Sequence, residues 1–326
     1  MHDLSHLIDK KLWLAPLAGY TDQGFRRTAK DWGVDVLVSE MVSADGLIRD
    51  SRKTIDYLLF TEAERPFGIQ IFGSNALIMA QAAEFCLRFS PDFIDINMGC
   101  PVKKVVKRGA GSALMRNPEI ASHIVKECKR ALGDTIPLSV KFRSGWDNSS
   151  LNYLDFGVLM QDSGADFLCL HPRTQKQMFS GKSNWEHIKL LKQQLQIPLI
   201  GNGDIGTPEL VMQMYKETAC DSIMIGRGAL GRPWIFEQTK ELQAGNSYGS
   251  ITIDQLKAAV LAHIDYALQH KPEHVVVREM RSQICHYTKG LNGGAELRRK
   301  VNQAKDSAEL RQLIQEGITD YAICLS

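Results

Sequence analysis

Short apolar runs alternate with helix-length amphipathic segments over the first 245 residues of the chain. Runs rich in β-branched and aromatic residues predict eight strands, at residues 12–15, 34–39, 67–71, 93–97, 138–142, 167–171, 199–202 and 222–225. Segments with helical periodicity predict eight helices, at residues 23–31, 45–49, 76–89, 118–132, 152–163, 185–195, 208–216 and 234–242. Eight alternating repeats in about 240 residues predict an α/β fold, the (β/α)8 or TIM barrel. A doubly wound open sheet is the alternative, but it usually has fewer strands.

The pattern changes after residue 245, where strand-like runs stop and only helical periodicity remains. Helices are predicted there at residues 253–270, 276–289, 295–303 and 307–317. Residues 243–247 are polar and contain a glycine, as expected of a linker. The sequence therefore predicts a barrel domain at 1–245 and a small all-helical C-terminal domain at 246–326.

Polar residues gather where seven of the eight predicted strands end. They are Ser39, Glu40, Gln70, Asn97, Lys141, Arg143, His171, Arg173, Asn202, Asp204 and Arg227. The first strand instead runs into Ala15-Pro16-Leu17-Ala18-Gly19, which offers backbone groups to a flat ligand. The active site of a (β/α)8 barrel lies at the carboxyl ends of its strands, so this distribution predicts one there.

Cys100 follows the fourth predicted strand directly, in the sequence Asp-Ile-Asn-Met-Gly-Cys-Pro at 95–101. A packed apolar cysteine is the common alternative, but the position at a strand end favours a catalytic thiol. Lys141 and His171 end the next two strands, and a cation there stabilises negative charge on a reduced cofactor ring. A Cys–His nucleophile pair is the other interpretation, although no orienting acid is identified for it.

The loops after the last two strands predict a phosphate site. They read Gly201-Asn202-Gly203-Asp204 and Gly226-Arg227-Gly228, which combine exposed backbone N–H groups with a guanidinium. Residues 226–231 also match the dinucleotide pattern G-x-G-x-x-G. That pattern should open a βαβ unit, whereas here no further strand follows, so a flavin or sugar-phosphate cradle is predicted instead.

Composition adds a constraint on partners. The chain has 326 residues, and its formal net charge of only +2 predicts no bulk attraction to nucleic acid. Positive charge is concentrated in two places, at Lys103, Lys104, Lys107 and Arg108, and in the segment 278–305, which includes Arg298, Arg299 and Lys300. Such a run is usually a solvated face, but two local clusters in a neutral protein favour RNA contact.

The cysteines and the hydropathy pattern bear on the compartment. Seven widely spaced cysteines are typical of reduced thiols in a cytoplasmic protein, and no pair has zinc-finger spacing, so no metal site is predicted. No run of 18 apolar residues and no signal-peptide pattern occurs, so no membrane contact is expected.

Five motifs together resemble the tRNA-dihydrouridine synthase family, and most of all its bacterial B-type branch. The motifs lie at residues 15–22, 95–101, 170–174, 201–205 and 226–234, and the resemblance spans nearly the whole chain. Two departures occur. Leu17 stands where methionine is usual, and Phe179 stands where the family often has tyrosine before Ser180-Gly181.

The resemblance implies tightly bound FMN, NADPH or NADH as reductant, and reduction of the 5,6 double bond of a uridine in the tRNA D-loop. It implies FMN contacts from Pro16, Leu17, Ala18, Gln70, Lys141, His171, Asn202, Gly203, Asp204, Gly226 and Arg227. Cys100 becomes the general acid that gives a proton to uracil C5 after hydride passes from flavin N5 to C6.

Substrate contacts follow from the same resemblance. Asn97 and Arg173, with His171, are implied as polar contacts to uracil or FMN. The target base must leave its stack to enter the pocket, and the basic clusters at Lys103, Lys104, Lys107 and Arg108 and at Arg298, Arg299 and Lys300 are expected to hold the tRNA backbone. The helical tail would dock the tRNA.

Two other functions remain open on the sequence. One is a flavin-dependent reductase of a free pyrimidine on the same barrel, which would not need the basic tail. The other is a non-catalytic RNA-binding protein, which would not need Cys100 together with Lys141. A protein partner is not implied, and a monomer is expected.

Overall fold

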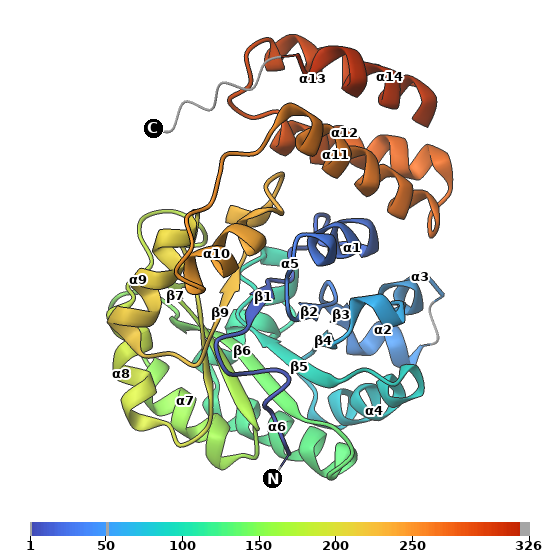
Figure 1. Ribbon diagram of the computed structural model, residues 1–326. Coiled ribbons are helices and arrows are strands. Elements are labelled where there is room, and N and C mark those ends of the chain that lie inside the picture. Colours follow the sequence, from blue (N-terminus) through green and yellow to red (C-terminus); the bar gives the residue numbers. More distant parts are fainter. Residues whose placement is uncertain (1, 50–51, 320–326) are drawn as a thin grey trace. The chain divides into compact units, whose positions relative to one another are not determined.

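The strands form one parallel sheet that curves into a barrel (Figure 1). The computed structural model describes residues 2–49 and 52–319, and within them nine strands belong to this sheet. They are β1 (Leu12–Leu14), β2 (Leu37–Val38), β3 (Val42–Ser43), β4 (Phe67–Phe72), β5 (Phe93–Met98), β6 (Leu138–Gly145), β7 (Phe167–Thr174), β8 (Leu199–Asn202) and β9 (Ser222–Ile225).

The sheet order is β1-β9-β8-β7-β6-β5-β4-β2, and β3 pairs with β4 beyond the end of β2. The two ends of this order meet where Trp13 of β1 forms a parallel bridge with Val36, just before β2. The Leu14 N–H donates to the Val36 carbonyl at 3.1 Å, which continues the same ladder. The predicted eight-stranded (β/α)8 barrel is therefore confirmed, and helical segments follow it at the C-terminal end.

Large side chains fill the inside of the barrel. The rings of Trp13, Phe93 and Phe167, from β1, β5 and β7, pack against one another with centroid separations of 5.2, 5.7 and 5.6 Å. Ile200 and Met224 join the same buried cluster. The barrel interior is thus a packed core that leaves the strands' carboxyl ends as the place for a ligand.

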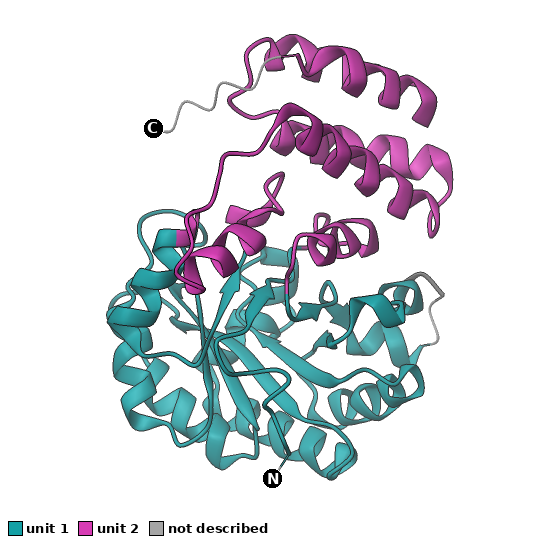
Figure 2. Cartoon of the chain, viewed as in Figure 1, with its two compact units in different colours: residues 1–17, 35–205, 209–226 teal, residues 18–34, 206–208, 227–326 magenta. Residues whose placement is uncertain are grey.

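The chain divides into two compact units, and the first contains the whole sheet (Figure 2). This unit comprises residues 1–17, 35–205 and 209–226. Its helices are α2 (Ala44–Ile48), α3 (Arg52–Ile55), α4 (Ala76–Cys86), α5 (Lys103–Val106), α6 (Pro118–Leu132), α7 (Tyr153–Asp162), α8 (Glu186–Gln194) and most of α9 (Pro208–Thr218). Short 3-10 turns are η1 (Asp56–Leu58), η2 (Glu62–Glu64), η3 (Leu87–Phe89) and η4 (Gly111–Arg116).

Local sequence signals set where these helices begin. The Asn75 side chain accepts a hydrogen bond from the Ile78 N–H at 3.1 Å and caps α4. Pro118 occupies the first turn of α6, where its missing N–H costs nothing. These signals set the start of α4 just after β4 and the start of α6 just after η4.

The second unit comprises residues 18–34, 206–208 and 227–326. Its helices are α1 (Gln23–Asp31), α10 (Ile235–Gln243), α11 (Ile253–Leu268), α12 (Glu273–Tyr287), α13 (Gly294–Val301) and α14 (Ser307–Gly317), with the 3-10 turn η5 (Arg227–Ala229). The domain boundary predicted at residue 245 stays a prediction. Residues 18–34, which come early in the chain, nevertheless share this unit with the C-terminal helices.

The contacts of α1 explain that membership. Gly24 lies so close to α11 that a Cβ on it would come within 3.0 Å of the Ala267 Cβ. Asp22 caps α1 by accepting from the Phe25 N–H at 3.0 Å and also pairs with Lys271 Nζ at 2.5 Å. The Gln283 amide of α12 donates to the Tyr20 carbonyl at 2.9 Å. The second unit is thus held together by contacts between the start and the end of the chain.

The predicted elements match the observed ones closely, with a few additions. The strand β3, the helix α5 and the turn η4 were not predicted. The strands β6 and β7 extend further than predicted, so that Arg143 and Arg173 lie within strands. Among the described residues, no helix is both long and apolar enough to cross a membrane. Cys324, one of the seven cysteines, lies outside the described residues.

Candidate active site

A chain of side-chain hydrogen bonds runs across β4 and β5 at their carboxyl ends. The buried Asp95 accepts from Ser139 Oγ at 2.5 Å and from Gln70 Nε2 at 2.6 Å. The Gln70 amide oxygen in turn accepts from Asn97 Nδ2 at 2.8 Å. Burial raises the pKa of Asp95, although the hydrogen bonds from Ser139 and Gln70 oppose that rise. The amides of Gln70 and Asn97 are therefore held in fixed orientations.

The loop that carries Cys100 rests on this chain. Asn97 Oδ1 accepts from the N–H groups of Gly99 at 3.1 Å and Cys100 at 2.9 Å. On the other side, Ser112 of η4 donates to the Cys100 carbonyl through both its N–H, at 3.1 Å, and its hydroxyl, at 2.9 Å. The turn that brings η4 there needs Gly111, because a Cβ on it would come within 2.8 Å of the Cys100 carbonyl oxygen.

The Cys100 thiol is half-buried, whereas Cys86, Cys128, Cys169 and Cys220 are fully buried. Burial raises the pKa of the Cys100 thiol above its ordinary value. The Val102 N–H and the positive charges of Arg143 and Lys141 oppose that rise. Cys100 is therefore a protonated thiol at neutral pH, which is the form that can give up a proton.

Lys141 lies in the neighbouring strand, where it pairs in register with Asn97. Its Nζ donates to Asn202 Oδ1 of β8 at 3.1 Å, while the Asn202 amide donates to the Met224 carbonyl of β9 at 2.7 Å. These bonds hold a cation at the carboxyl ends of the strands. Such a cation can stabilise an anion that forms there.

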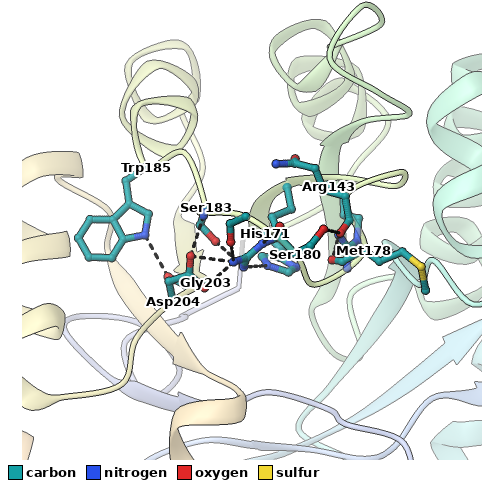
Figure 3. A network of polar contacts seen from close by, with 11 residues as sticks. Arg143, His171, Met178, Ser180, Ser183, Trp185, Gly203 and Asp204 are labelled. Carbon is teal, nitrogen blue, oxygen red and sulfur yellow. Dashed lines mark hydrogen bonds and ion pairs between the residues drawn. The ribbon is translucent and has the colours of Figure 1, made fainter. Parts of the chain in front are cut away.

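Arg173 of β7 is the centre of a second network (Figure 3). It is 2% exposed, and its Nη2 donates to both carboxylate oxygens of Asp204, at 2.7 and 2.8 Å. It also lies 3.3 Å from His171 Nε2 and donates to Ser183 Oγ at 2.8 Å. Two further bonds reach the carbonyls of the loop after β7, at Ser180 and Gly181. The guanidinium of Arg173 thus donates these hydrogen bonds to other residues of the protein.

Asp204 and Gly203 complete this network. Burial on its own raises the pKa of Asp204, but hydrogen bonds from Ser183 and Arg173 and the Arg173 charge outweigh it and hold that pKa below its ordinary value. Gly203 has φ +131, and a Cβ on it would come within 2.5 Å of Ser183 Oγ. Its carbonyl accepts from Trp185 Nε1 at 3.0 Å, as Figure 3 shows. A glycine is required here by both φ and space.

Arg143 of β6 forms the third group of contacts, although the sequence pattern predicts no role for it beyond a strand end. Its guanidinium donates to the carbonyls of Gly99 at 2.7 Å, Thr174 at 3.0 Å and Met178 at 2.8 Å. Asp95, Ser139 and Ser183 were also not assigned. A signal for Arg143 was available, since it follows Lys141 at the two-residue spacing that puts both side chains on one face of a strand.

The structure thus brings several predicted residues together. Gln70 and Asn97 join beneath Cys100, Lys141 meets Asn202, and His171 meets Arg173, which holds Asp204. The remaining predicted flavin contacts are Pro16, Leu17 and Gly226 in the first unit and Ala18 and Arg227 in the second. Their roles, and that of Arg173 as a uracil contact, stay predictions.

The two predicted basic clusters differ in their contacts. Lys103, Lys104, Lys107 and Arg108 are all exposed on and just after α5. In α13, Arg298 donates to the Thr288 carbonyl at 2.9 Å, at the end of α12, and Arg299 pairs with Glu296 at 2.7 Å. Lys300 lies 3.9 Å from the same carboxylate. Arg298 therefore has a structural contact, while Arg299 and Lys300 share one acidic partner.

Comparison with known proteins identifies the family of this chain. A profile described as "Dihydrouridine synthase (Dus)" matches residues 13–323. A "Probable tRNA-dihydrouridine synthase" of Treponema pallidum (strain Nichols) is 35% identical over 314 residues, which cover 94% of this chain and 92% of that protein. A "tRNA-dihydrouridine synthase B" of Vibrio vulnificus (strain CMCP6) is 36% identical over 317 residues, covering 97% and 98%.

Two solved structures share the fold at low sequence identity. A 2-naphthoyl-CoA reductase complex aligns over 76% of this chain with a TM-score of 0.56 and 11% identity. Histamine dehydrogenase from Rhizobium sp. 4-9 aligns over 81% with a TM-score of 0.55 and 13% identity. The chain spans about half the length of these solved chains, 52% and 50%, and at this identity the likeness concerns the fold alone. Because the family profile and its relatives cover nearly the whole sequence, this protein belongs to the dihydrouridine synthase family.

Proposed function

We propose that this protein reduces the 5,6 double bond of a uridine in the tRNA D-loop, with FMN as cofactor and NADPH or NADH as reductant. The observation that carries the proposal is the Cys100 loop, whose backbone N–H Asn97 holds and whose carbonyl Ser112 holds, next to the strand that carries Lys141. Burial raises the pKa of the half-buried thiol on this loop, which favours its protonated form. Membership of the dihydrouridine synthase family and the tRNA-dihydrouridine synthase names of the relatives agree with it.

The residues at the strand ends of the first unit fit a flavin. The amides of Gln70, Asn97 and Asn202 supply donors and acceptors suited to the edge of the ring, and Lys141 supplies a cation. Asp204 would repel a phosphate on its own, but its ion pair with Arg173 cancels that charge. Gly226 and Arg227 would then hold the phosphate with backbone N–H groups and a guanidinium.

Bound FMN would supply the hydride that adds to uracil C6, because hydride transfer is chemistry that side chains do not provide. Cys100 would donate its proton to C5, the other carbon of the double bond. Its raised pKa favours the protonated thiol before that step. Lys141 would stabilise the negative charge that develops before protonation. Asn97 would orient the uracil edge, since its own orientation is fixed by Gln70.

The tRNA would reach this site by extrusion of the uridine from its stack, which requires cations to hold the backbone on either side. Lys103, Lys104, Lys107 and Arg108 are exposed and follow Cys100 by a few residues. They are the first candidates to contact the phosphates that flank the flipped nucleotide. Arg299 and Lys300 of α13 are the candidates in the second unit, and we infer that the helical tail docks the tRNA.

The test uses purified full-length protein and a tRNA transcript that lacks modifications. We expect a flavin absorbance spectrum, release of FMN and not FAD on denaturation, and NADPH-dependent dihydrouridine in the transcript but not from free uridine. Reduction of free uridine at a comparable rate would support the free-pyrimidine reductase instead. A colourless protein with no activity would contradict the proposal. Mapping dihydrouridine in tRNA from a deletion strain would identify the uridine that is modified.

A further inference from the structure

Arg143 joins the loop that carries Cys100 to the segment at the end of β7. Its Nε donates to the Gly99 carbonyl, one residue before the thiol of Cys100. Its Nη1 donates to the carbonyls of Thr174, the last residue of β7, and Met178, in the loop that follows. The side chain is 2% exposed, so these bonds form in a water-poor place where each is worth more than at a surface. One buried guanidinium therefore fixes both loops.

The loop after β7, residues 174–181, is held in a specific conformation. Gln177 Oε1 accepts from the Thr174 N–H at 2.7 Å, and Arg173 holds the Ser180 and Gly181 carbonyls. Met178 has φ +49, in the left-handed region that a non-glycine residue adopts only when its surroundings impose it. The Met178 carbonyl is the one that Arg143 binds, and Figure 3 shows the two side by side. Arg143 is thus part of what imposes this backbone.

The same loop presents an aromatic ring to solvent. Phe179 is 46% exposed, and its ring lies 5.7 Å from Arg143 Cζ, within range of a cation–π interaction. Arg143 consequently contacts the loop through two carbonyls and one ring, and the Cys100 loop through one carbonyl. A change of position in either loop would have to break or stretch bonds to the other.

We propose that Arg143 is a positioning residue that locks the Cys100 loop to the loop at 174–181, so that the thiol stands at a fixed place when the uridine arrives. The inference rests on the proposed function. It assigns Arg143 a role through Gly99 and not through contact with the substrate. Displacement of a catalytic group by about 1 Å can cost 10²-fold in rate, so the loss of this lock is expected to affect proton delivery strongly.

Arg143 also acts on the thiol through its charge. A positive charge favours the thiolate, so Arg143 lowers the pKa of Cys100 against the rise that burial causes, and its removal should raise that pKa further. Lys141 acts in the same direction from the same strand. Other charged or titratable groups on the elements around the thiol are Asp95 of β5, Lys103 and Lys104 of α5, Arg116 of η4, and His171 and Arg173 of β7.

The experiment compares Arg143→Met, which removes the charge and the fork, with Arg143→Lys, which keeps the charge and loses the fork. Cys285 and Cys324 are replaced by serine so that Cys100 is the thiol followed by iodoacetamide, and peptide mass spectrometry confirms the labelled site. Labelling rates against pH give the inflection of the Cys100 thiol. Stopped-flow measurements give flavin reduction by NADPH, and single-turnover assays give dihydrouridine formation in tRNA.

In Arg143→Met we expect the labelling inflection to move to higher pH and single-turnover tRNA reduction to fall by about 10- to 100-fold. Flavin reduction by NADPH should stay within about twofold, because it needs no proton from this loop. Arg143→Lys should keep an inflection near that of the wild type, yet remain slow in the tRNA step, since an ammonium cannot reproduce the planar fork that binds carbonyls of two loops.

Arg65 provides a matched control. It too joins separated segments, through the Ser90 carbonyl at 2.8 Å and the Asp92 carboxylate at 2.9 Å, but it does so before β5 begins. Arg65→Met should leave the inflection unchanged. An Arg143→Met protein with a wild-type inflection, or an Arg143→Lys protein with a wild-type single-turnover rate, would overturn the inference. If the wild type forms no dihydrouridine, the proposed function fails, while the labelling profiles still test Arg143.

Discussion

A series of hydrogen bonds, each with a defined donor and acceptor, links the buried Asp95 to the Cys100 loop. Asp95 accepts a hydrogen bond from Gln70 Nε2, so the Gln70 oxygen must face Asn97, and the Asn97 oxygen must face the N–H groups of the Cys100 loop. Each amide is turned by the group before it. A buried carboxyl group two residues upstream of Asn97 therefore determines which atom the loop rests on, although it lies below the loop itself.

Replacing Cys100 with alanine separates the two halves of the proposed reaction. Flavin binding and flavin reduction by NADPH should continue at wild-type rates, because neither needs the thiol. Reduction of tRNA uridine should fall by about 10²- to 10⁴-fold, the usual contribution of a general acid. Single-turnover kinetics measure each half separately. Wild-type tRNA reduction by the Cys100→Ala enzyme would remove Cys100 from the mechanism and leave it as a packing residue.

The pH dependence of the tRNA step follows from the same thiol. A general acid works only while protonated, so the rate should be level through neutral pH and decline as the pH rises through the pKa of Cys100. Burial raises that pKa, so the decline should begin above the ordinary thiol value of about 8.5. Single-turnover rates measured from neutral to strongly alkaline pH would show it. A decline centred below the ordinary thiol value would contradict the assignment.

Arg227 offers a test of the phosphate site. Arg227→Ala should weaken retention of FMN, because a guanidinium to phosphate contact is a strong charge-assisted bond. Equilibrium dialysis against free FMN measures the change, with riboflavin, which lacks the phosphate, as the matched ligand. The variant should bind riboflavin as the wild type does. Equal FMN affinity in both proteins would show that Arg227 does not contact the phosphate.

For single residues, the sequence could predict which side chains lie at the site but not which groups they contact. Cys100, Lys141 and Asn202 could be selected because polar residues at strand ends share one face of a barrel. The role of Arg143 could not be predicted, because the carbonyls that it binds lie 31 to 44 positions away along the chain. Backbone carbonyls occur at every residue, so the sequence does not mark them. Whether Arg173 faces a ligand or the protein depends on Asp204, Ser183 and two loop carbonyls that only the folded chain brings together.

Among elements, the long amphipathic helices were predictable and the short connecting ones were not. The limits of α1 and α6 match their prediction because start signals mark them, the capping Asp22 and Pro118 in the first turn. The turn η4 and the four-residue α5 carry too few residues to show a period. They nevertheless determine the site, because η4 supplies the Ser112 that binds the Cys100 carbonyl.

The cap of α1 allows an element-scale prediction. Burial alone would raise the pKa of Asp22, but the His263 imidazole and the Lys271 ammonium beside the carboxylate hold it below its ordinary value. The carboxylate therefore stabilises the folded state above its unfolded pKa of about 4, and this contribution is lost as the pH falls below that value. Asp22→Asn should lower the free energy of unfolding by about 1–3 kcal/mol at pH 7, between the values for exposed and buried pairs.

The companion variant tests the cap itself. Asparagine caps a helix as well as aspartate does, whereas alanine does not, so Asp22→Ala should cost about 1 kcal/mol more than Asp22→Asn. Urea unfolding at neutral pH and well below the unfolded pKa of the carboxyl measures both variants against the wild type. If Asp22→Asn loses as much stability in acid as at neutral pH, the ion pair with Lys271 is not the source of the effect.

At the scale of the whole molecule, the chain is nearly neutral and its positive charge is local. Arg299 and Lys300 share Glu296 as partner. Replacing both with glutamine should weaken tRNA binding and reduce the slope of log affinity against log salt by up to about 2, because each cation that binds a phosphate contributes about one to that slope. Flavin reduction by NADPH should not change. Filter binding over a range of KCl concentrations measures the slope.

Glu296→Gln is the matched control for that cluster. It frees both cations from their acidic partner, so it should strengthen tRNA binding where the double variant weakens it. Arg298 is left in place, because it holds the Thr288 carbonyl at the end of α12. Unchanged affinity in both variants would show that the charges on this face of α13 are solvated and do not bind tRNA.

The attachment of α1 to the C-terminal helices has a consequence for protein synthesis. Asp22 and Lys271 are 249 residues apart, and Tyr20 and Gln283 are 263 apart. A ribosome adds about 5–20 residues per second, so α1 leaves it roughly 12–50 s before its partners do. A helix of nine residues is not stable alone in water, so the nascent segment waits unfolded with Phe25 uncovered. A chain that stops anywhere before α11 therefore lacks the helix against which Gly24 and Phe25 of α1 pack.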